Sequence, residues 1–250
     1  MPPEDVGYPV PSVSSNQFSK QWFSTFMHTM PQDWTRVEVD GVMRRLPLPG
    51  FSRLLDVCCG TGRHAAMLAE RGYEVTGIDR DEDALSRARS LAPRSTFHQL
   101  DQRELRGLGG PFDAAMILWQ SFGYFDSGTN DRVLVDLAAL IRPGGRLLLD
   151  LFHPGYFVGD QNAARPPRAE GVVITNEVRR GRLISNIEYA DGATETMNFE
   201  LFAPEQIIER AARTGFTLVE QCCWWDEQRP PDPSVQRYQI VFERLSIPAS

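Results

Sequence analysis

The chain has 250 residues, 42% of them hydrophobic, and a formal net charge of −7. This length accommodates one domain with a sizeable core, with or without an appended lobe. The acidic balance argues against a nucleic-acid partner, because proteins that bind nucleic acid neutralise phosphates with clustered lysines and arginines. No apolar run approaches membrane-spanning length, and no signal-peptide pattern begins the sequence. We therefore expect a soluble cytoplasmic protein with no membrane partner.

The four cysteines form two adjacent pairs, Cys58-Cys59 and Cys222-Cys223. Zinc sites commonly use cysteines separated by two residues, and this spacing is absent, so we expect no metal site. Buried free thiols in a reducing compartment are the expected state of all four side chains.

Residues 1–50 are expected to lie outside the main domain, which we place at residues 51–250. Residues 1–16 are rich in proline and serine, which predicts a flexible tail. Between Gln17 and Met30 the aromatic residues Phe18, Trp22, Phe23 and Phe26 recur at helical spacing. Such a helix could dock on the core or act as a lid over a ligand cleft, and the sequence leaves both open.

From Phe51 onward strand and helix patterns alternate, which predicts a parallel sheet with helices on both faces. The predicted strands are Arg53–Val57, Tyr73–Ile78, Ser95–Leu100, Phe112–Leu118 and Arg146–Leu151. The predicted helices are Gly62–Arg71, Glu82–Leu91 and Asp131–Ile141. The fourth strand is apolar throughout, as is typical of strands that helices cover on both sides.

After the fifth strand, short strands with turn signals between them predict an antiparallel β-ribbon, inserted at residues 170–203. The predicted strands of this ribbon are Val172–Val178, Leu183–Tyr189 and Glu195–Phe202. The pair Asp191-Gly192 is a strong hairpin signal. A helix at Pro204–Thr214 and an antiparallel pair of strands, Phe216–Cys223 and Val235–Arg244, are predicted to follow.

The most informative segment spans residues 54–64. There an apolar run ends on Asp56, and a short turn with Gly60 and Gly62 leads into an alanine-rich helix. A strand, a tight loop and a helix N-terminus in this order form a cradle for nucleotide-like ligands. Asp79 ends the next predicted strand, and an acid at that place can accept hydrogen bonds from both hydroxyls of a ribose.

Together, five segments of the chain resemble the class I S-adenosylmethionine-dependent methyltransferases. They are Leu54–Gly62, Val75–Asp79, Leu100-Asp101, Phe112–Phe125 and the run Arg142-Pro143-Gly144-Gly145-Arg146 that leads to Asp150. One glycine-rich loop is a weak signal, but five segments in the order of the family are specific. The resemblance is close over residues 51–151 and holds in outline beyond them.

The resemblance implies an α/β fold with a Rossmann-like, doubly wound sheet of seven strands, the last of them antiparallel. It also implies S-adenosyl-L-methionine as the cofactor. The inserted ribbon and an N-terminal helical lid would then cover the site. The expected reaction is in-line displacement at the sulfonium methyl by a nitrogen or oxygen nucleophile.

One position departs from the pattern of the family, because Cys58 stands where the loop usually has glycine. A side chain there narrows the space between backbone and ligand. The rival interpretation, a nicotinamide-dependent dehydrogenase, needs glycine at this place so that a pyrophosphate can approach closely. S-adenosylmethionine carries no phosphate, so the departure counts more heavily against the dehydrogenase.

The resemblance implies roles for residues at the carboxyl ends of the strands. Asp56 would bind the ammonium of the cofactor, Asp79 its ribose hydroxyls and Asp101 its adenine amino group. Arg63 would lie near the cofactor carboxylate. The full set implied for cofactor binding is Asp56, Cys58, Cys59, Gly60, Gly62, Arg63, Asp79, Arg80, Asp101, Gln102 and Leu118. An acid that ends a strand is also a common helix N-cap, and this is the competing interpretation of Asp101.

A small-molecule acceptor is expected, as in natural-product and amino-sugar methyltransferases, because aromatic residues follow the fourth strand and the motifs of base-modifying enzymes are absent. The residues expected to line the acceptor pocket are Trp22, Phe26, Trp119, Gln120 and Tyr124. His153, just past the fifth strand, is the candidate catalytic base or acceptor contact. A loop histidine without a catalytic role is the alternative.

Two other functions stay open at this level. One is methylation of a protein or peptide, which a long open groove would favour. The other is a catalytically silent protein that binds the cofactor and serves a partner. The sequence does not decide the oligomeric state, since the ribbon could form a homodimer or cover the substrate.

Overall fold

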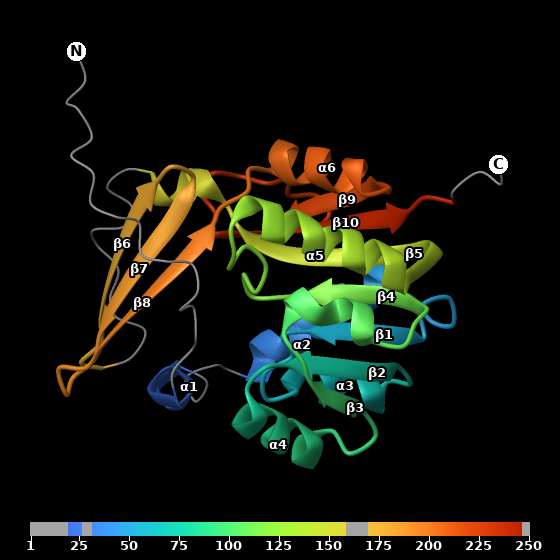
Figure 1. Ribbon diagram of the computed structural model, residues 1–250, viewed down its shortest axis with the longest axis horizontal. Coiled ribbons are helices and arrows are strands. Elements are labelled where there is room, and N and C mark those ends of the chain that lie inside the picture. The colour runs from blue at the N-terminus through green and yellow to red at the C-terminus, as the bar shows by residue number, and fades with distance from the viewer. Residues whose placement is uncertain (1–19, 27–31, 159–169, 247–250) are drawn as a thin grey trace.

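The computed structural model describes residues 20–26, 32–158 and 170–246. Its centre is a seven-stranded sheet in the order β3-β2-β1-β4-β5-β10-β9 (Figure 1). The strands are β1 (Arg53–Val57), β2 (Glu74–Asp79), β3 (Thr96–Gln99), β4 (Phe112–Ile117), β5 (Ile141–Phe152), β9 (Phe216–Cys223) and β10 (Arg237–Arg244). β1 to β5 are parallel, whereas β10 is antiparallel to both of its neighbours, β5 and β9. The predicted Rossmann-like sheet with an antiparallel last strand is confirmed.

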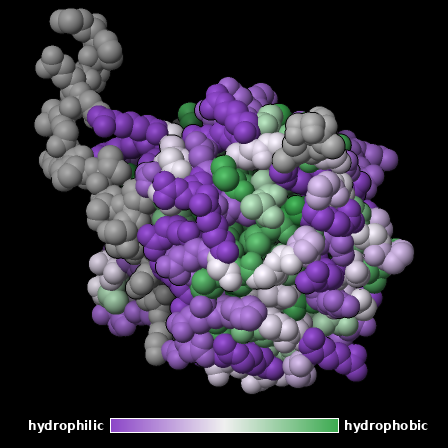
Figure 2. Space-filling view, turned by 45° about the vertical axis from the view of Figure 1, so that its right-hand side comes forward, coloured by the Kyte–Doolittle hydropathy of each residue, from purple (hydrophilic) through white to green (hydrophobic). Residues whose placement is uncertain are grey.

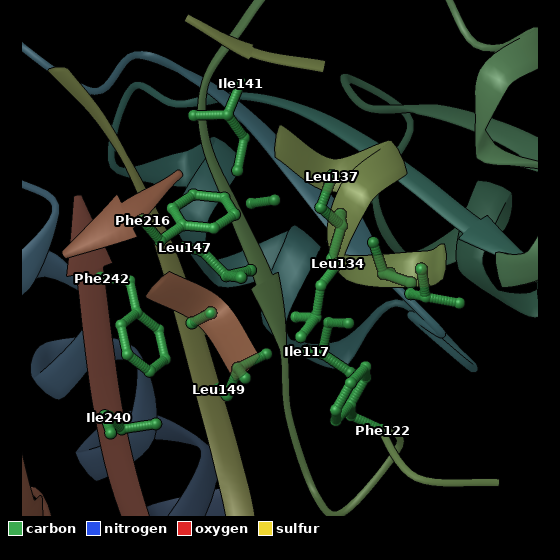
Figure 3. Close-up of a cluster of buried hydrophobic side chains, with 14 of the residues drawn as sticks. Ile117, Phe122, Leu134, Leu137, Ile141, Leu147, Leu149, Phe216, Ile240 and Phe242 are labelled. Atoms are coloured by element: carbon green, nitrogen blue, oxygen red, sulfur yellow. The ribbon is translucent and has the colours of Figure 1, made fainter. Parts of the chain in front are cut away.

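One face of this sheet is covered by α5 (Ser127–Leu140) and α6 (Pro204–Arg213). Leu134 and Leu137 of α5 share a buried cluster with Ile117 of β4 (Figure 3). Burial of one such aliphatic side chain contributes about 1.5–3 kcal/mol of transfer free energy. This core therefore fixes the position of β4, whose carboxyl end leads into the candidate site.

The opposite face is covered by α2 (Gln32–Arg45), α3 (Arg63–Glu70) and α4 (Glu82–Leu91). Leu55 of β1 belongs to the first core, and its neighbour Leu54 belongs to this second one. This alternation follows from the two-residue repeat of a strand that is buried on both sides. Other members of the second core are Val42, Leu68, Leu85 and Leu148.

The inserted ribbon is a separate three-stranded antiparallel sheet that stands beside the main sheet (Figure 1). Its strands are β6 (Val173–Arg179), β7 (Arg182–Glu188) and β8 (Thr194–Glu200). The ribbon is tied to the chain that follows β4. Arg182 donates a hydrogen bond of 2.8 Å to the Phe125 carbonyl, and the Glu200 N–H donates one of 2.7 Å to the Gly123 carbonyl.

The aromatic N-terminal stretch includes the short helix α1 (Lys20–Phe26). Phe26 lies in the buried cluster that also contains Phe199 of the ribbon, and Gln21 donates a hydrogen bond of 3.0 Å to Asp191. The helix thus docks on the ribbon, and its action as a lid stays a prediction. The predicted tail at residues 1–16, together with Phe18 and Met30, lies outside the described residues.

Helix α2 is absent from the sequence-based prediction. Its β-branched residues and Gly41 give the segment a low helix propensity. Tertiary packing overrides that propensity, because Val39 and Val42 are fully buried in the second core and Leu46 follows on the same face. The omission matters, since this helix carries an acidic residue of the candidate site.

Two further boundaries differ from the prediction. α5 begins at Ser127 rather than Asp131, because the Asp126 carboxylate caps the helix by accepting from the Thr129 N–H at 2.9 Å. β5 begins at Ile141, which pairs with Phe112 of β4, rather than at Arg146. The other predicted elements from Arg53 onward lie within two residues of their observed bounds.

The surface in Figure 2 is mostly hydrophilic, with a smaller central group of hydrophobic residues. Large hydrophobic side chains that are exposed, such as Val135 on α5 and Leu218 on β9, belong to several different elements. Within the described ranges, the structure contains no helix with both the length and the hydropathy that crossing a bilayer requires.

Candidate active site

The loop after β1 lies at the edge of the sheet where β1, β2 and β4 end. Gly62 has φ +75°, and a β-carbon added there would lie 2.8 Å from the Cβ of Ala88 on α4. Gly60 has φ +54°, and an added β-carbon would meet no atom within 4 Å. Packing therefore requires glycine at position 62, whereas Gly60 leaves open space beside the loop. Cys58 adopts φ +60° although it carries a side chain, a conformation that costs about 1–2 kcal/mol.

Asp56 lies at the carboxyl end of β1 and is 2% exposed. Its Oδ2 atom is buried without a hydrogen-bond partner in the described part of the chain. Burial raises the pKa of Asp56 to about 8, the charge of Arg63 opposes that rise, and the charge of Asp79 adds to it. An unpartnered buried acid of this kind fits a ligand that brings a positive charge. The ammonium of S-adenosylmethionine is such a group.

Asp79 ends β2 and reaches back to the glycine-containing loop. Its Oδ2 accepts from the Gly60 N–H at 2.9 Å, and its Oδ1 accepts from the Asp81 N–H at 3.0 Å. Burial raises the pKa of Asp79 above its usual value, and these backbone hydrogen bonds work in the opposite direction. The carboxylate thus lies beside the open space at Gly60. Binding of ribose hydroxyls by Asp79, and contact of Arg80 with adenine, stay predictions.

Asp101 follows β3 and caps a short 3-10 helix, Gln102–Gly107. Its two carboxylate oxygens accept from the Arg103 guanidinium at 2.9 and 2.8 Å. Burial favours the protonated form, but the hydrogen bonds from Arg103 outweigh it and hold the pKa of Asp101 below its usual value. Gln102 is buried and donates to the Ser121 carbonyl at 3.0 Å. The capping interpretation of Asp101 is therefore realised, and contact with adenine stays a prediction.

All four cysteines are free thiols. Burial raises the pKa of both Cys58 and Cys59 above its usual range, and the nearby carboxylates Asp56 and Asp79 add to this effect. Both side chains are therefore neutral at physiological pH and are poor nucleophiles. In the described ranges, no group of three or more His, Cys, Asp or Glu side chains could hold a metal ion.

Beyond β4, Leu118 is buried in the second core, and the next two residues leave the strand in an uncommon conformation. Trp119 has φ +57° and Gln120 has φ +56°. Hydrogen bonds to Asp150 of β5 stabilise this turn: the Trp119 N–H donates to its carboxylate and the Gln120 N–H to its carbonyl, both at 3.0 Å. The Gln120 amide is 2% exposed and is bonded to the backbone of Phe122 and Phe152. This places Gln120 in the junction of β4 and β5, and its contact with an acceptor stays a prediction.

A partly buried ionic network contacts Trp119, and its central acid, the buried Glu38 on α2, is missing from the sequence-based prediction. Glu38 accepts from Arg63 at 2.8 Å and from Arg237 at 3.3 Å, and Arg237 donates to Asp150 at 2.8 Å. The guanidinium carbons of Arg63 and Arg237 lie 5.0 and 4.0 Å from the centroid of the Trp119 ring. We refer to Glu38, Arg63, Arg237, Asp150 and Trp119 as the Trp119 network.

Protonation states within the network follow from burial and charge. Burial alone would raise the pKa of Glu38, but the hydrogen bond from His64 and the charges of His64, Arg63 and Arg237 lower it to about 2. Burial and the charge of Arg63 lower the pKa of His64 to about 4, against the effect of Glu38. At neutral pH, Glu38 is therefore charged and His64 is neutral. The His64 Nε2–H then donates to Glu38 at 2.8 Å.

Three of the aromatic residues predicted for the acceptor pocket pack in one cluster with the ribbon, whereas the fourth, Trp119, lies in the ionic network. Trp22 and Phe26 of α1 have ring centroids 5.4 Å apart. Phe26 and Tyr124 share one buried cluster with the apolar face of the ribbon, and the ring of Tyr124 lies 5.1 Å from that of Phe199. The structure thus brings these three residues together in one cluster. Their contact with an acceptor stays a prediction.

His153 follows β5 and caps the short helix Pro154–Phe157. The Gly155 N–H donates to its Nδ1 at 3.1 Å, so the proton of the neutral ring resides on Nε2. Burial lowers the pKa of His153 below its usual value, and the charges of Glu205 and Asp232 oppose that effect. The ring is therefore neutral at physiological pH and carries its N–H donor on Nε2. A role as general base stays a prediction, and the capping bond to Nδ1 restricts it.

Comparison with known proteins gives consistent matches. The Methyltransferase domain family matches residues 54–145. A glycine/sarcosine N-methyltransferase of Halorhodospira halochloris is 30% identical over 205 residues, which cover 75% of this chain and 75% of that protein. The dTDP-3-amino-3,4,6-trideoxy-alpha-D-glucopyranose N,N-dimethyltransferase of Streptomyces venezuelae is 31% identical over 144 residues, or 57% of this chain and 56% of that enzyme. The chain thus spans little more than half the length of several curated relatives that it matches.

Among solved structures, an S-adenosylmethionine-dependent methyltransferase from Clostridium acetobutylicum superposes with a TM-score of 0.71. The superposition covers 92% of this chain and 99% of that protein at 15% sequence identity, so it establishes the fold alone. The sequence relatives establish the family, and the sheet order and loop geometry agree with it. The chain belongs to the class I S-adenosylmethionine-dependent methyltransferases.

Proposed function

We propose that this protein transfers a methyl group from S-adenosyl-L-methionine to a nitrogen atom of a small-molecule acceptor. The observation that carries this proposal is the unpartnered buried acid Asp56 at the end of β1, in the same strand-loop segment as Gly60, where an added β-carbon would meet open space. That space would admit the cofactor, and the carboxylate would receive its ammonium. When bound, S-adenosylmethionine supplies a methyl group that a positively charged sulfur already activates.

The residues of the chain bind and orient the cofactor. Asp56 holds the ammonium, and Asp79 holds the ribose hydroxyls next to the Gly60 loop. The chain after β3, with Asp101 and Gln102, borders the adenine. These carboxylates end adjacent parallel strands, the place where open α/β sheets bind ligands. Because Asp79 is already fixed by two backbone hydrogen bonds, its orientation costs little on binding.

The acceptor is an amine bound against the aromatic cluster of α1, Tyr124 and the ribbon. The relatives that support a nitrogen acceptor are named for amino-sugar and glycine/sarcosine N-methylation. An amine can lose its proton to water before the reaction, so no general base is required. This agrees with the state of His153, which is neutral and whose Nδ1 already accepts from the Gly155 N–H. Its Nε2–H would then contact the acceptor. Alignment of amine and methyl group can then lower the barrier by about 7–11 kcal/mol.

Two measurements on the purified protein test the proposal. The first is calorimetric titration with S-adenosylhomocysteine and, separately, with NAD. The proposal predicts binding of the former and no binding of the latter; the opposite result would overturn it in favour of a dehydrogenase. The second is mass spectrometry after incubation with S-adenosylmethionine and a panel of amino sugars, amino acids and other small amines. Gain of one methyl mass on a member of the panel is the expected result. Cofactor binding with no product in any incubation would instead assign a catalytically silent binding protein.

A further inference from the structure

Two buried polar atoms at the carboxyl edge of the sheet lack a partner among the residues that the structure describes. They are Asp56 Oδ2, an acceptor, and Trp119 Nε1, a donor. β1 and β4 are adjacent parallel strands in which Asp56 pairs with Met116, and Trp119 follows the end of β4. Buried polar groups nearly always have hydrogen-bond partners, so such a pair at a binding site calls for a ligand. A ligand with a cation and an anion on one carbon atom matches one acceptor and one donor.

The indole of Trp119 is held firmly in its place. Its backbone N–H is bonded to the Asp150 carboxylate at 3.0 Å, and the guanidinium of Arg237 lies 4.0 Å from the ring centroid. Arg63 lies 5.0 Å from the same centroid, and Glu38 binds both arginines. Because these contacts connect α2, α3, β5 and β10 with the segment after β4, they restrain the indole ring before any ligand binds. Such pre-organisation is typical of a binding residue.

The two arginines that contact Trp119 are already paired with Glu38 and Asp150, but they keep donors that can serve an anion at its indole N–H. Two guanidinium groups contact the ring, and each has several N–H donors, of which the Trp119 network uses only some. Arg63 is also the first residue of α3, where the helix dipole favours negative charge. A carboxylate that accepts from the indole would therefore find guanidinium N–H donors nearby. Asp56, with its raised pKa, disfavours an anion at its own position and fits the cationic partner group.

We propose that Trp119 binds the cofactor, with its indole N–H donating to the cofactor carboxylate while Asp56 accepts from the adjacent ammonium. This assignment moves Trp119 from the acceptor pocket, where the sequence placed it, to the amino-acid end of the cofactor. Glu38 is then a positioning residue, since it acts by holding the two arginines against the indole. The inference rests on the proposed function, because it presupposes that S-adenosylmethionine occupies this site.

The test removes the proposed hydrogen bond in two ways, by deleting the donor from the protein and by deleting the acceptor from the ligand. Trp119→Phe keeps an aromatic ring for the arginines but deletes the N–H. The ligands are S-adenosylhomocysteine and its decarboxylated analogue, S-adenosyl-3-thiopropylamine, which lacks only the carboxylate. We expect the variant to bind S-adenosylhomocysteine about 10- to 100-fold more weakly, on the order of one hydrogen bond to a charged group. Its affinity for the decarboxylated analogue should equal that of the wild type.

Trp225→Phe is the matched control. Trp225 is buried, whereas Trp119 is half-buried, but Trp225 likewise has a positive φ (+61°) and lies beside an arginine, with the Arg45 guanidinium carbon 5.7 Å from its ring. Its ring packs on Gly41 of α2 rather than on the loop after β1. This variant should bind both ligands as the wild type does. A second measurement needs no variant: the indole N–H resonance of Trp119 should shift downfield with S-adenosylhomocysteine and not with the analogue.

The outcomes separate the two proposals. Equal weakening of both ligands by Trp119→Phe, or no weakening of either, would overturn the assignment of Trp119 and leave the proposed function intact. An indole resonance that moves equally with both ligands has the same meaning. Failure of the wild-type protein to bind either ligand would instead overturn the proposed function, and this inference with it.

Discussion

The carboxylate of Glu38 on α2 accepts a hydrogen bond of 2.8 Å from the guanidinium of Arg63, the first residue of α3. The same carboxylate binds Arg237, which is 199 residues away in the chain. Through this single acid, the N-terminal part of the chain is connected to the loop that follows β1 and to the last strand of the sheet. The helix that carries Glu38 is thus part of the site rather than an appendage to it.

Replacement Glu38→Gln should lower the free energy of unfolding by about 3 kcal/mol, because it removes the acid that pairs with the partly buried Arg63 and one of the two acids that pair with Arg237. Asp40→Asn on the same helix is the control: Asp40 pairs with Arg71 at 3.8 Å on the surface, and its loss should cost about 0.5 kcal/mol or less. Urea unfolding at pH 7 measures both values. Equal effects of the two substitutions would contradict the central role of Glu38.

The difference in stability between the wild type and Glu38→Gln should depend on pH, and the pKa of Glu38 determines the direction of this dependence. Glu38 has a pKa of about 2 in the folded protein, below its ordinary 4.5. A carboxyl group whose pKa is lower in the folded than in the unfolded protein stabilises the fold at pH values above its unfolded pKa. This stabilisation is lost as the pH falls through its folded pKa. The difference in unfolding free energy between wild type and Glu38→Gln should therefore shrink between pH 4.5 and pH 2. A difference that stays constant over this range would mean that charge is not its cause.

Asp56→Asn should stabilise the free protein while it weakens cofactor binding. The pKa of Asp56 is raised from 3.8 to about 8 in the folded protein, so stability is lost as pH rises between these values. At pH 8 the variant should be more stable than the wild type by on the order of a few kcal/mol, and near pH 4 the two should be alike. Thermal melting across this pH range tests the effect. If the wild type were instead more stable than Asp56→Asn at pH 8, burial would not be disfavouring the ionised form of Asp56.

Binding of S-adenosylhomocysteine should release a proton from Asp56. At pH 7 this carboxyl is mostly protonated in the free protein, since its pKa is about 8, and the ammonium of the ligand favours the ionised form. Calorimetry in buffers of different ionisation enthalpy measures the number of protons released. We expect a value approaching one proton for the wild type at pH 7 and near zero for Asp56→Asn, if that variant is titrated at a concentration high enough to bind. No proton release by the wild type would place the ammonium elsewhere.

Gly60→Ala and Gly62→Ala should separate binding from stability. Gly62→Ala places a methyl group 2.8 Å from the Cβ of Ala88 in addition to backbone strain, and should cost about 2–5 kcal/mol of stability. Gly60→Ala meets no protein atom within 4 Å, so it should cost only about 1–2 kcal/mol. Its methyl group would instead occupy the space proposed for the cofactor. Unfolding and calorimetry on both variants check this, and tight cofactor binding by Gly60→Ala would rule out that location.

His153→Asn should raise the KM for the acceptor several-fold and leave kcat almost unchanged. Asparagine is a good N-cap and can replace the bond from the Gly155 N–H, so the local structure is kept while the Nε2–H is lost. Steady-state kinetics over a range of pH distinguish this role from general-base catalysis. Loss of a general base would instead slow turnover by about two orders of magnitude or more and would remove an ionisation from the pH profile.

The order of the main elements could be predicted from the sequence because the signals are local. Asp56 and Asp79 each end an apolar strand, and Gly60 and Gly62 mark a turn between a strand and a helix. Parallel strands bring such ends to one edge of a sheet, so the crevice with its carboxylates follows from pattern alone. The turn residues between its short strands predict the separate ribbon, whereas the antiparallel last strand of the seven-stranded sheet follows from the resemblance to the family.

Tertiary contacts alone decided how the Trp119 network is formed. Local propensity did not indicate α2, which forms because its apolar face is buried against the second core. Nothing in the immediate sequence of Glu38, Trp119 or Arg237 predicts that they meet, since each is distant from the others in the chain. Their contact depends on desolvation and charge pairing, which arise only when the folded sheet brings these segments together. The sequence by itself therefore determined the strand, loop and helix that carry Asp56, Gly60 and Gly62, and the folded protein determined that Glu38, Arg237 and Trp119 lie together beside them.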